Sequence, residues 1–176
     1  MSDAKPSSKH HHHRKDAVTR VPVAVITVSD TRTLEDDTGG ALVAELLEAG
    51  GHGVASREIV KDEPEAIRAA LDSALGREGV RGVIFTGGTG VAPRDVTPES
   101  VAPFLEREVP GFGELFRMLS YEDIGSAALL SRAVAGLARG RVVFVIPGSR
   151  GAVRLALERL ILPELGHLAA EAVKAR

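Results

Sequence analysis

The feature that most constrains the fold is a repeated alternation of short Val/Ile-rich runs with longer amphipathic segments. Buried strands are predicted for the apolar runs at 21–28, 82–85 and 141–146, and a further strand is predicted at 54–60. Helices are predicted for the segments 40–49, 64–75, 98–108, 114–119, 127–138 and 152–162. This alternation is typical of an α/β fold with three layers, in which a mostly parallel sheet carries helices on both faces.

The chain contains 176 residues, and the first 20 read as a tail because they show no apolar periodicity. The tail includes a histidine run, His10 to His13, which is interpreted as a solvated or artificial extension rather than a metal site. Residues 21–176 are the right size for one domain with its own core.

Composition excludes several classes of function. The 22 Lys and Arg residues nearly balance the 24 Asp and Glu residues, and the chain has only one Tyr and five Phe, so nucleic-acid binding is not expected. Without cysteine, thiolate catalysis and disulfides are excluded. No apolar stretch is long enough to span a bilayer and no signal peptide is evident, so a cytoplasmic protein is expected.

The strand at 82–85 leads into a glycine-rich turn, which consists of Thr86, Gly87, Gly88, Thr89 and Gly90. Its backbone N–H groups can face a ligand with no Cβ in the way. Arg94 and Asp95 follow at once, and a helix start comes next, with Thr97 as the predicted N-cap and Pro98 in the first turn. An anion cradle, a guanidinium and a metal-binding carboxylate therefore converge, which is the combination that phosphate chemistry requires.

The glycine turn by itself is weak evidence. No Gly-Lys-Ser/Thr follows, so it is not a P-loop, and Pro93 replaces the third glycine of a dinucleotide fingerprint. A plain strand-to-helix connection remains the alternative, although such a connection has no use for the charges of Arg94 and Asp95.

Ligands of parallel sheets bind beyond the carboxyl ends of the strands. Four segments follow predicted strands and can share one crevice: Ser29-Asp30, Lys61-Asp62, Thr86 to Asp95, and Pro147-Gly148-Ser149-Arg150. The last segment, a Gly-Ser turn at a helix start, is a second candidate phosphate site.

The predicted helix at 127–138 is apolar around most of its circumference. Such a helix is buried on more than one side, and in a domain this small an interface between subunits is attractive. Homo-oligomerisation is therefore expected.

In their order and spacing, several motifs resemble the molybdenum cofactor biosynthesis proteins of the MoaB/Mog type over nearly all of residues 21–165. They are the strand ending in Ser29-Asp30, the turn with its Arg94-Asp95-Val96-Thr97-Pro98 extension, Pro110-Gly111-Phe112-Gly113-Glu114, Leu130-Ser131-Arg132 and Pro147-Gly148-Ser149. The phrase 116–125, from Phe116 to Gly125, looks more like the MoaB branch.

The resemblance implies a specific reaction, in which molybdopterin is adenylylated by MgATP to give adenylyl-molybdopterin and pyrophosphate. A separate enzyme would then insert molybdate or tungstate. Family members of this type assemble as trimers, or as hexamers in the MoaB branch.

The resemblance also implies roles for particular residues. Asp62 and Asp95 match the two acids regarded as essential in the Mog branch, with Asp95 as the expected Mg²⁺ ligand. The turn from Thr86 to Gly90 would hold phosphates. Further contacts to nucleotide or pterin are expected from Ser29, Asp30, Arg94, Pro147, Gly148 and Ser149.

Each of these residues also has a structural alternative. Asp62 fits a helix cap, and Ser29 and Asp30 fit a strand end. Asp36 and Asp37 precede a helix and fit either its cap or a ligand contact, since the family pattern places their loop near the site. Arg132 favours a structural or intersubunit ion pair, and Glu114, which can cap a helix or pair across an interface, receives no catalytic role.

One departure from the family pattern matters. Mog and plant-type members carry Pro-Gly-Asn/Gln-Pro where this chain has Pro147-Gly148-Ser149-Arg150, so contacts made by that side chain do not transfer. A non-catalytic pterin-binding or assembly protein of the same pathway therefore stands as the alternative function. A nucleotide-binding oxidoreductase is disfavoured by the broken dinucleotide fingerprint.

Overall fold

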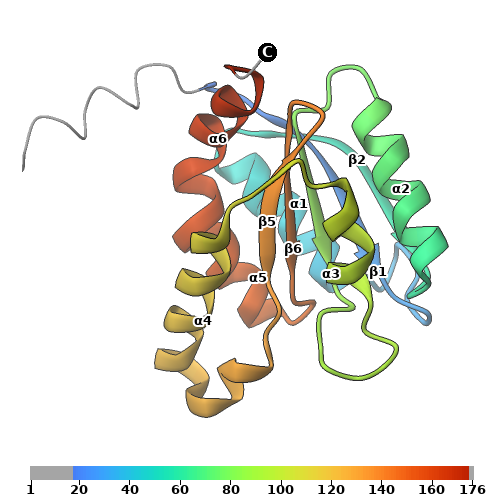
Figure 1. Ribbon diagram of the computed structural model, residues 1–176, viewed down its shortest axis with the longest axis vertical. Helices are drawn as coiled ribbons and strands as arrows, with labels where there is room; N and C mark the ends of the chain where they lie inside the picture. The colour runs from blue at the N-terminus through green and yellow to red at the C-terminus, as the bar shows by residue number, and fades with distance from the viewer. Residues whose placement is uncertain (1–17, 175–176) are drawn as a thin grey trace, which may run out of the picture.

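The protein is described by a computed structural model that covers residues 18–174. The histidine run and the rest of the predicted tail up to residue 17 lie outside these residues. Within them, one six-stranded sheet has the strand order β2-β1-β3-β6-β5-β4. The expected three-layer α/β fold is confirmed (Figure 1).

Four parallel strands form the centre of the sheet: β1 (Pro22–Val28), β2 (Gly53–Val60), β3 (Gly82–Thr86) and β6 (Arg141–Ile146). Two antiparallel strands, β5 (Val134–Ala138) and the short β4 (Arg107–Glu108), complete one edge. The chain passes from β1 to β2 on one side and then returns to β3 on the other. The strand order therefore reverses between β1 and β3, which is where such sheets bind ligands.

Alternate residues of the central strands face opposite helical layers. Val23 and Val25 of β1 join a core with α1 (Thr38–Ala49), α4 (Pro110–Ile124), α5 (Arg150–Ala156) and α6 (Leu162–Lys174). Ala24 and Ile26 join the opposite core, with α2 (Pro64–Gly76) and α3 (Thr97–Val101). The helices α4, α5 and α6 and the helices α2 and α3 lie on opposite sides of the sheet in Figure 1.

The predicted helix at 127–138 is wrong. A 3₁₀ helix, η3 (Gly125–Leu130), is followed by the strand β5, which pairs with β6 on one side and β4 on the other. The Ala- and Leu-rich sequence favours a helix locally, but two neighbouring strands override that preference. Leu129 is 81% exposed within this chain, whereas Ala128, Ala133 and Ala135 are buried, and the expected burial between subunits stays a prediction.

Three other helices differ from prediction in length. The helix predicted at 114–119 extends over the whole of α4, from Pro110 to Ile124. The segment predicted at 98–108 divides into α3, the 3₁₀ turn η2 (Ala102–Phe104) and β4, because Pro103 cannot donate a hydrogen bond inside a helix. The helix predicted at 152–162 instead continues to Lys174 through a π-helical turn, η4 (Leu157–Ile161), just before Pro163. Within residues 18–174 no helix is long and apolar enough to cross a membrane.

Candidate functional site

The segments that follow the four parallel strands meet at one edge of the sheet, as predicted. The N–H of Ser29, after β1, donates to the carbonyl of Val60 at the end of β2 (2.9 Å). The N–H of Gly87, after β3, donates to the carbonyl of Ile146 at the end of β6 (3.0 Å). The hydroxyl of Thr86 donates to the carbonyl of Pro147 (3.3 Å). The loop after β3 projects from the lower edge of the sheet in Figure 1.

A cavity of about 200 Å³ opens at this edge, between the ends of β1, β3 and β6. We call it the strand-end cavity. Asp37 and Gly39 at the N-terminus of α1 also reach it, whereas the glycine turn contributes only Thr86 and Gly87 to its lining. Its lining residues are Thr27, Val28, Ser29, Arg32, Asp37, Gly39, Thr86, Gly87, Gly148 and Ser149.

The glycines of the turn are required by its backbone. Gly87 has φ of +104° and Gly88 has φ of +63°, and a Cβ on Gly87 would lie 2.5 Å from the carbonyl oxygen of Val28. The N–H groups of residues 88–91 donate to no acceptor within residues 18–174. They are therefore available to an anionic ligand, as the sequence predicted.

Asp62 lies across the crevice from the turn and is not a helix cap. The N-cap position of α2 is Glu63, which makes no side-chain cap bond. One carboxylate oxygen of Asp62, Oδ1, is buried without a hydrogen-bond partner, and so is the hydroxyl oxygen of Thr97. A Cβ placed on Gly88 would lie 3.0 Å from the first oxygen and 2.2 Å from the second. Two unpaired oxygens therefore flank the same glycine, which indicates a position for a cation or another donor.

The electrostatics of Asp62 fit this position. Burial of its carboxylate raises the pKa of Asp62, and the negative charge of Asp95 raises it further. The backbone N–H of Val96 lowers it. The two acids are therefore close enough to repel one another, and a cation between them would relieve that repulsion.

Asp95 is oriented by its own loop. Its carboxylate accepts the N–H of Ala92 (3.1 Å), and its backbone N–H donates to the carbonyl of the same residue (2.9 Å). Thr97 was predicted to cap α3, and this is wrong: Val96 occupies the cap position and no side chain caps the helix. The hydroxyl of Thr97 instead faces Gly88.

Other predicted residues have a clear structural role. The hydroxyl of Ser29 accepts the N–H groups of Thr31 (3.3 Å) and Arg32 (3.2 Å), which shapes the turn after β1. The carboxylate of Asp30 accepts the N–H of Asp62 (3.0 Å) and forms an ion pair with Arg94. Asp30 and Arg94 thus join two of the converging segments.

Asp37 is the cap of α1, which was one of its two predicted roles. Its carboxylate accepts the N–H of Gly40 (2.9 Å) and the hydroxyl of Thr27 (2.8 Å), and it pairs with Arg57 (3.2 Å). The sequence did not single out Arg32, which lines the strand-end cavity. The position of Arg32, two residues after Asp30 in the segment that follows β1, could have indicated that it lies near the site.

Ser149 connects the strand-end cavity with a second, mostly apolar cavity of about 340 Å³. The hydroxyl of Ser149 also caps α5 by accepting the N–H of Ala152 (3.3 Å). The lining of this second cavity is Phe116, Ser120, Asp123, Ile124, Ser131, Pro147, Ser149, Gly151, Ala152 and Leu155.

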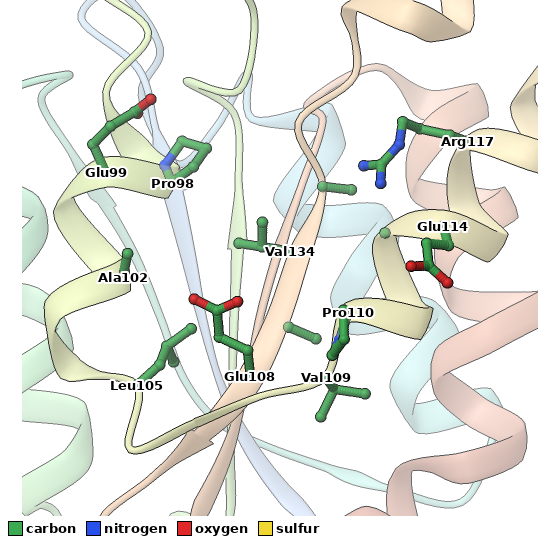
Figure 2. A pocket seen from close by; sticks show the side chains of 13 residues that line it. Pro98, Glu99, Ala102, Leu105, Glu108, Val109, Pro110, Glu114, Arg117 and Val134 are labelled. Carbon is green, nitrogen blue, oxygen red and sulfur yellow. The ribbon is translucent and has the colours of Figure 1, made fainter.

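A further cavity, of about 380 Å³, lies between α3 and α4 over β5 and contains no predicted site residue. Figure 2 shows Glu99 on the α3 side of this cavity, Glu114 and Arg117 on the α4 side, and Val134 between the two helices. It lies beyond the antiparallel edge strand, away from the switch point between β1 and β3.

The fold and the site define an α/β protein whose ligand crevice lies at the switch point of a parallel sheet. A family profile described as "Probable molybdopterin binding domain" matches residues 24–167. The "Molybdenum cofactor biosynthesis protein B" of Halalkalibacterium halodurans is 52% identical over 165 residues, covering 93% of this chain and 97% of the relative.

Solved structures agree with these sequence matches. A crystal structure of a molybdenum cofactor biosynthesis protein B superposes with a TM-score of 0.85 at 54% identity, covering 87% of this chain and 96% of the other. The tungsten cofactor synthesizing protein MoaB from Pyrococcus furiosus gives 0.80 at 39% identity, covering 89% and 99%. This chain belongs to the MoaB/Mog family of molybdenum cofactor biosynthesis proteins, on the MoaB side of that family.

Proposed function

We propose that this protein adenylylates molybdopterin with MgATP. The terminal phosphate of the pterin attacks the α-phosphorus of ATP and forms a new P–O bond. The bond between the α-phosphorus and the oxygen that bridges to the β-phosphate breaks, and pyrophosphate leaves. The product then passes, in a transient contact, to a separate enzyme that inserts the metal oxyanion. The observation that carries this proposal is the pair of unpaired oxygens, on Asp62 and Thr97, beside a glycine turn with free N–H groups.

Phosphoryl chemistry depends on positioning and on charge more than on covalent help from the protein. The free N–H groups of residues 88–91 hold the phosphates of the nucleotide, and the start of α1 offers a second anion-binding position at the neighbouring strand-end cavity. Both act as preorganised dipoles aimed at the charge that develops on the phosphates.

Magnesium fits this site only together with its substrate. Within the described part of the chain, no three His, Cys, Asp or Glu side chains gather in a way that could hold a metal. Asp95 and Asp62, with the Thr97 hydroxyl, supply the protein oxygens, and phosphate oxygens and water complete the set that Mg²⁺ prefers. The bound ion would supply neutralisation of charge on the transferring phosphate.

The second substrate fits the apolar cavity that borders Ser149. Ile124 and Leu155 provide an apolar surface for the pterin ring, and Pro147, Gly148 and Ser149 lie where its phosphate approaches the strand-end cavity. Because Ser149 borders both cavities, the pterin phosphate would approach the nucleotide at this residue.

The second candidate function is a pterin-binding or assembly protein without catalysis. The observation in its favour is that Arg94, a predicted phosphate ligand, is instead engaged in an ion pair with Asp30. The departure at Ser149-Arg150 points the same way.

The deciding experiment is incubation of the protein with MgATP and molybdopterin, followed by mass detection of adenylyl-molybdopterin. Product and pyrophosphate in equal amounts, formed only when both substrates are present, support the enzyme. Pterin binding without AMP transfer would instead establish the non-catalytic function.

The sharpest variant is Asp95→Asn, which is nearly isosteric and keeps an oxygen for the Ala92 N–H. We expect adenylyl transfer to fall on the order of a hundredfold or more, as is typical when one electrostatic transition-state contact is removed. Molybdopterin affinity should change much less, because the pterin is expected near Ser149.

The matched control is Asp72→Asn, which removes an exposed carboxylate that pairs with Arg139 on the surface. It should leave transfer unchanged. Normal turnover and normal Mg²⁺ dependence in Asp95→Asn would remove Asp95 from the mechanism.

A further inference from the structure

Arg132 joins the loop between η3 and β5 to the loop that carries Asp95. Its Nε donates to the carbonyl oxygens of Gly90 (2.9 Å) and Thr89 (3.4 Å). One terminal nitrogen donates to the carbonyl oxygen of Asp95, and the other pairs with the carboxylate of Glu99. The guanidinium therefore binds three backbone carbonyls of one loop and the first turn of the helix that follows it.

These three carbonyls fix the direction of three N–H groups. In a planar trans peptide the N–H points opposite to the C=O. When the carbonyls of Thr89 and Gly90 face Arg132, the N–H groups of Gly90 and Val91 face away from it. Those two N–H groups have no acceptor among residues 18–174, so they belong to the set available to phosphate.

The third peptide, between Asp95 and Val96, has the same arrangement. The carbonyl of Asp95 faces Arg132, and the N–H of Val96 hydrogen-bonds to the carboxylate of Asp62. One side chain thus orients both the phosphate-binding turn and a peptide that contacts the second acid.

We propose that Arg132 is a positioning residue for nucleotide binding, which holds the loop 87–96 with its N–H groups turned toward the ligand. This inference rests on the proposed function of the same site. It differs from the role expected from the sequence, in which Arg132 forms an ion pair only. The Glu99 pair is one of four contacts, and the carbonyl contacts define the role.

Arginine is needed because its planar fork carries five donors in fixed directions. A lysine at this position keeps the charge, but a single ammonium cannot satisfy four acceptors spread around the guanidinium plane. The substitution Arg132→Lys therefore separates geometry from charge.

The test compares Arg132→Lys with the wild type in steady-state adenylyl transfer. We expect kcat/KM for MgATP to fall about ten- to hundredfold, as for loss of charge-assisted hydrogen bonds. The KM for molybdopterin should change by less than about threefold, because no contact of Arg132 reaches the apolar cavity. A general loss of structure would raise both KM values together, and that outcome would contradict the proposal.

Amide hydrogen exchange tests the clamp without any substrate. The N–H of Thr97 donates to Gly88 (3.1 Å) and that of Asp95 to Ala92 (2.9 Å), so both report on the loop. In Arg132→Lys these two amides should exchange at least about tenfold faster, whereas the central strands keep their protection. Unchanged exchange at both amides would overturn the proposal, even if the wild type proves to have no transferase activity.

Two control variants complete the design. Arg141 also donates to backbone carbonyls, of Arg139 (2.7 Å) and Arg77 (3.5 Å), but at the opposite end of β6. Arg141→Lys should leave MgATP kinetics and the loop amides unchanged. Glu99→Gln removes the charge partner of Arg132 and keeps its three carbonyl contacts, so a loss as large as that of Arg132→Lys would assign the effect to the ion pair instead.

Discussion

Asp62 and Thr97 differ in how far the sequence could predict their roles. Asp62 follows a buried strand and could be assigned to the crevice by topology alone. Thr97 stands before a proline, where a cap is the ordinary interpretation. Its hydroxyl turns toward Gly88 because the helix begins at Thr97 itself, one residue earlier than the cap assignment requires. That displacement depends on the loop and is not visible in local sequence.

His52 offers a prediction about stability at this scale. It is 8% exposed, and its Nδ1 accepts the N–H of Val21 at the start of β1 (3.2 Å). Burial lowers the pKa of His52 below its ordinary 6.5, so the folded protein disfavours the charged ring. The unfolded chain then binds more protons below pH 6.5, and stability is lost as the pH falls through that value.

The measurement is the thermal midpoint between pH 7.5 and pH 5, for the wild type and for His52→Asn. The asparagine side-chain oxygen can accept the Val21 N–H and does not titrate. We expect a smaller loss of stability toward acid pH in the variant. Parallel curves for the two proteins would show that His52 does not contribute.

At the scale of elements, the strands were easier to predict than the helices. Three of the parallel strands, β1, β3 and β6, are recognisable because both of their faces are buried, which leaves nearly continuous apolar runs. β5 has no such run, since Ala135 and Gly136 separate its two large side chains, Val134 and Leu137. It is a strand because it pairs with β6 and β4, and a local sequence pattern does not reveal such pairing between separate segments.

The geometry of the glycine turn predicts the effect of adding one methyl group at Gly88. In Gly88→Ala the new Cβ would lie 2.2 Å from the Thr97 hydroxyl and 3.0 Å from the Asp62 carboxylate, at φ of +63°. We expect about 1–3 kcal/mol of destabilisation. MgATP affinity should fall more than about tenfold, because the methyl group fills the space between the two unpaired oxygens and displaces the turn.

Gly111→Ala serves as the control for this variant. Gly111 lies in the first turn of α4, and a Cβ there meets nothing within 4 Å. Stability should stay the same or rise slightly, since alanine favours a helix. Calorimetric titration with MgATP compares the two variants, and wild-type affinity in Gly88→Ala would argue against a ligand at this turn.

For the whole molecule, the four strand-end segments lie together at one edge of the sheet, as predicted, although Lys61 and Asp62 do not line the strand-end cavity. The prediction succeeded because parallel strands bring their carboxyl ends to one edge whatever their order. The antiparallel edge and the tie from Arg132 to the Asp95 loop could not be foreseen, because both depend on residues 125–138 leaving the helical path that their sequence favours.

The proposal that this protein forms a homo-oligomer now rests on α4 and not on the predicted helix at 127–138. The helix expected between subunits does not exist, but α4 presents exposed apolar side chains at every third position: Leu115, Met118, Tyr121 and Ile124. Together with Leu129 and Leu130 they form an apolar surface suited to a second copy of this chain. We expect a homo-oligomer, which the family resemblance describes as a trimer or hexamer.

Light scattering after size exclusion tests this with Met118→Glu, in which a charge replaces a 55% exposed apolar side chain. The variant should shift toward smaller species at micromolar concentration, because an unpaired charge is costly to bury in an interface. Val173→Glu, on the far part of α6, should behave as the wild type. A wild type that is monomeric would contradict the proposal.

The strand-end cavity has a consequence for the lifetime of the protein. Its walls come from residues between Thr27 and Ser149, so it exists only when almost the whole chain has folded. A ligand held there binds the native state and not the unfolded chain, and at a hundred times its dissociation constant it adds about 2.7 kcal/mol to stability. Substrate supply would then govern abundance as well as turnover, since a starved protein unfolds more often and meets proteases more often.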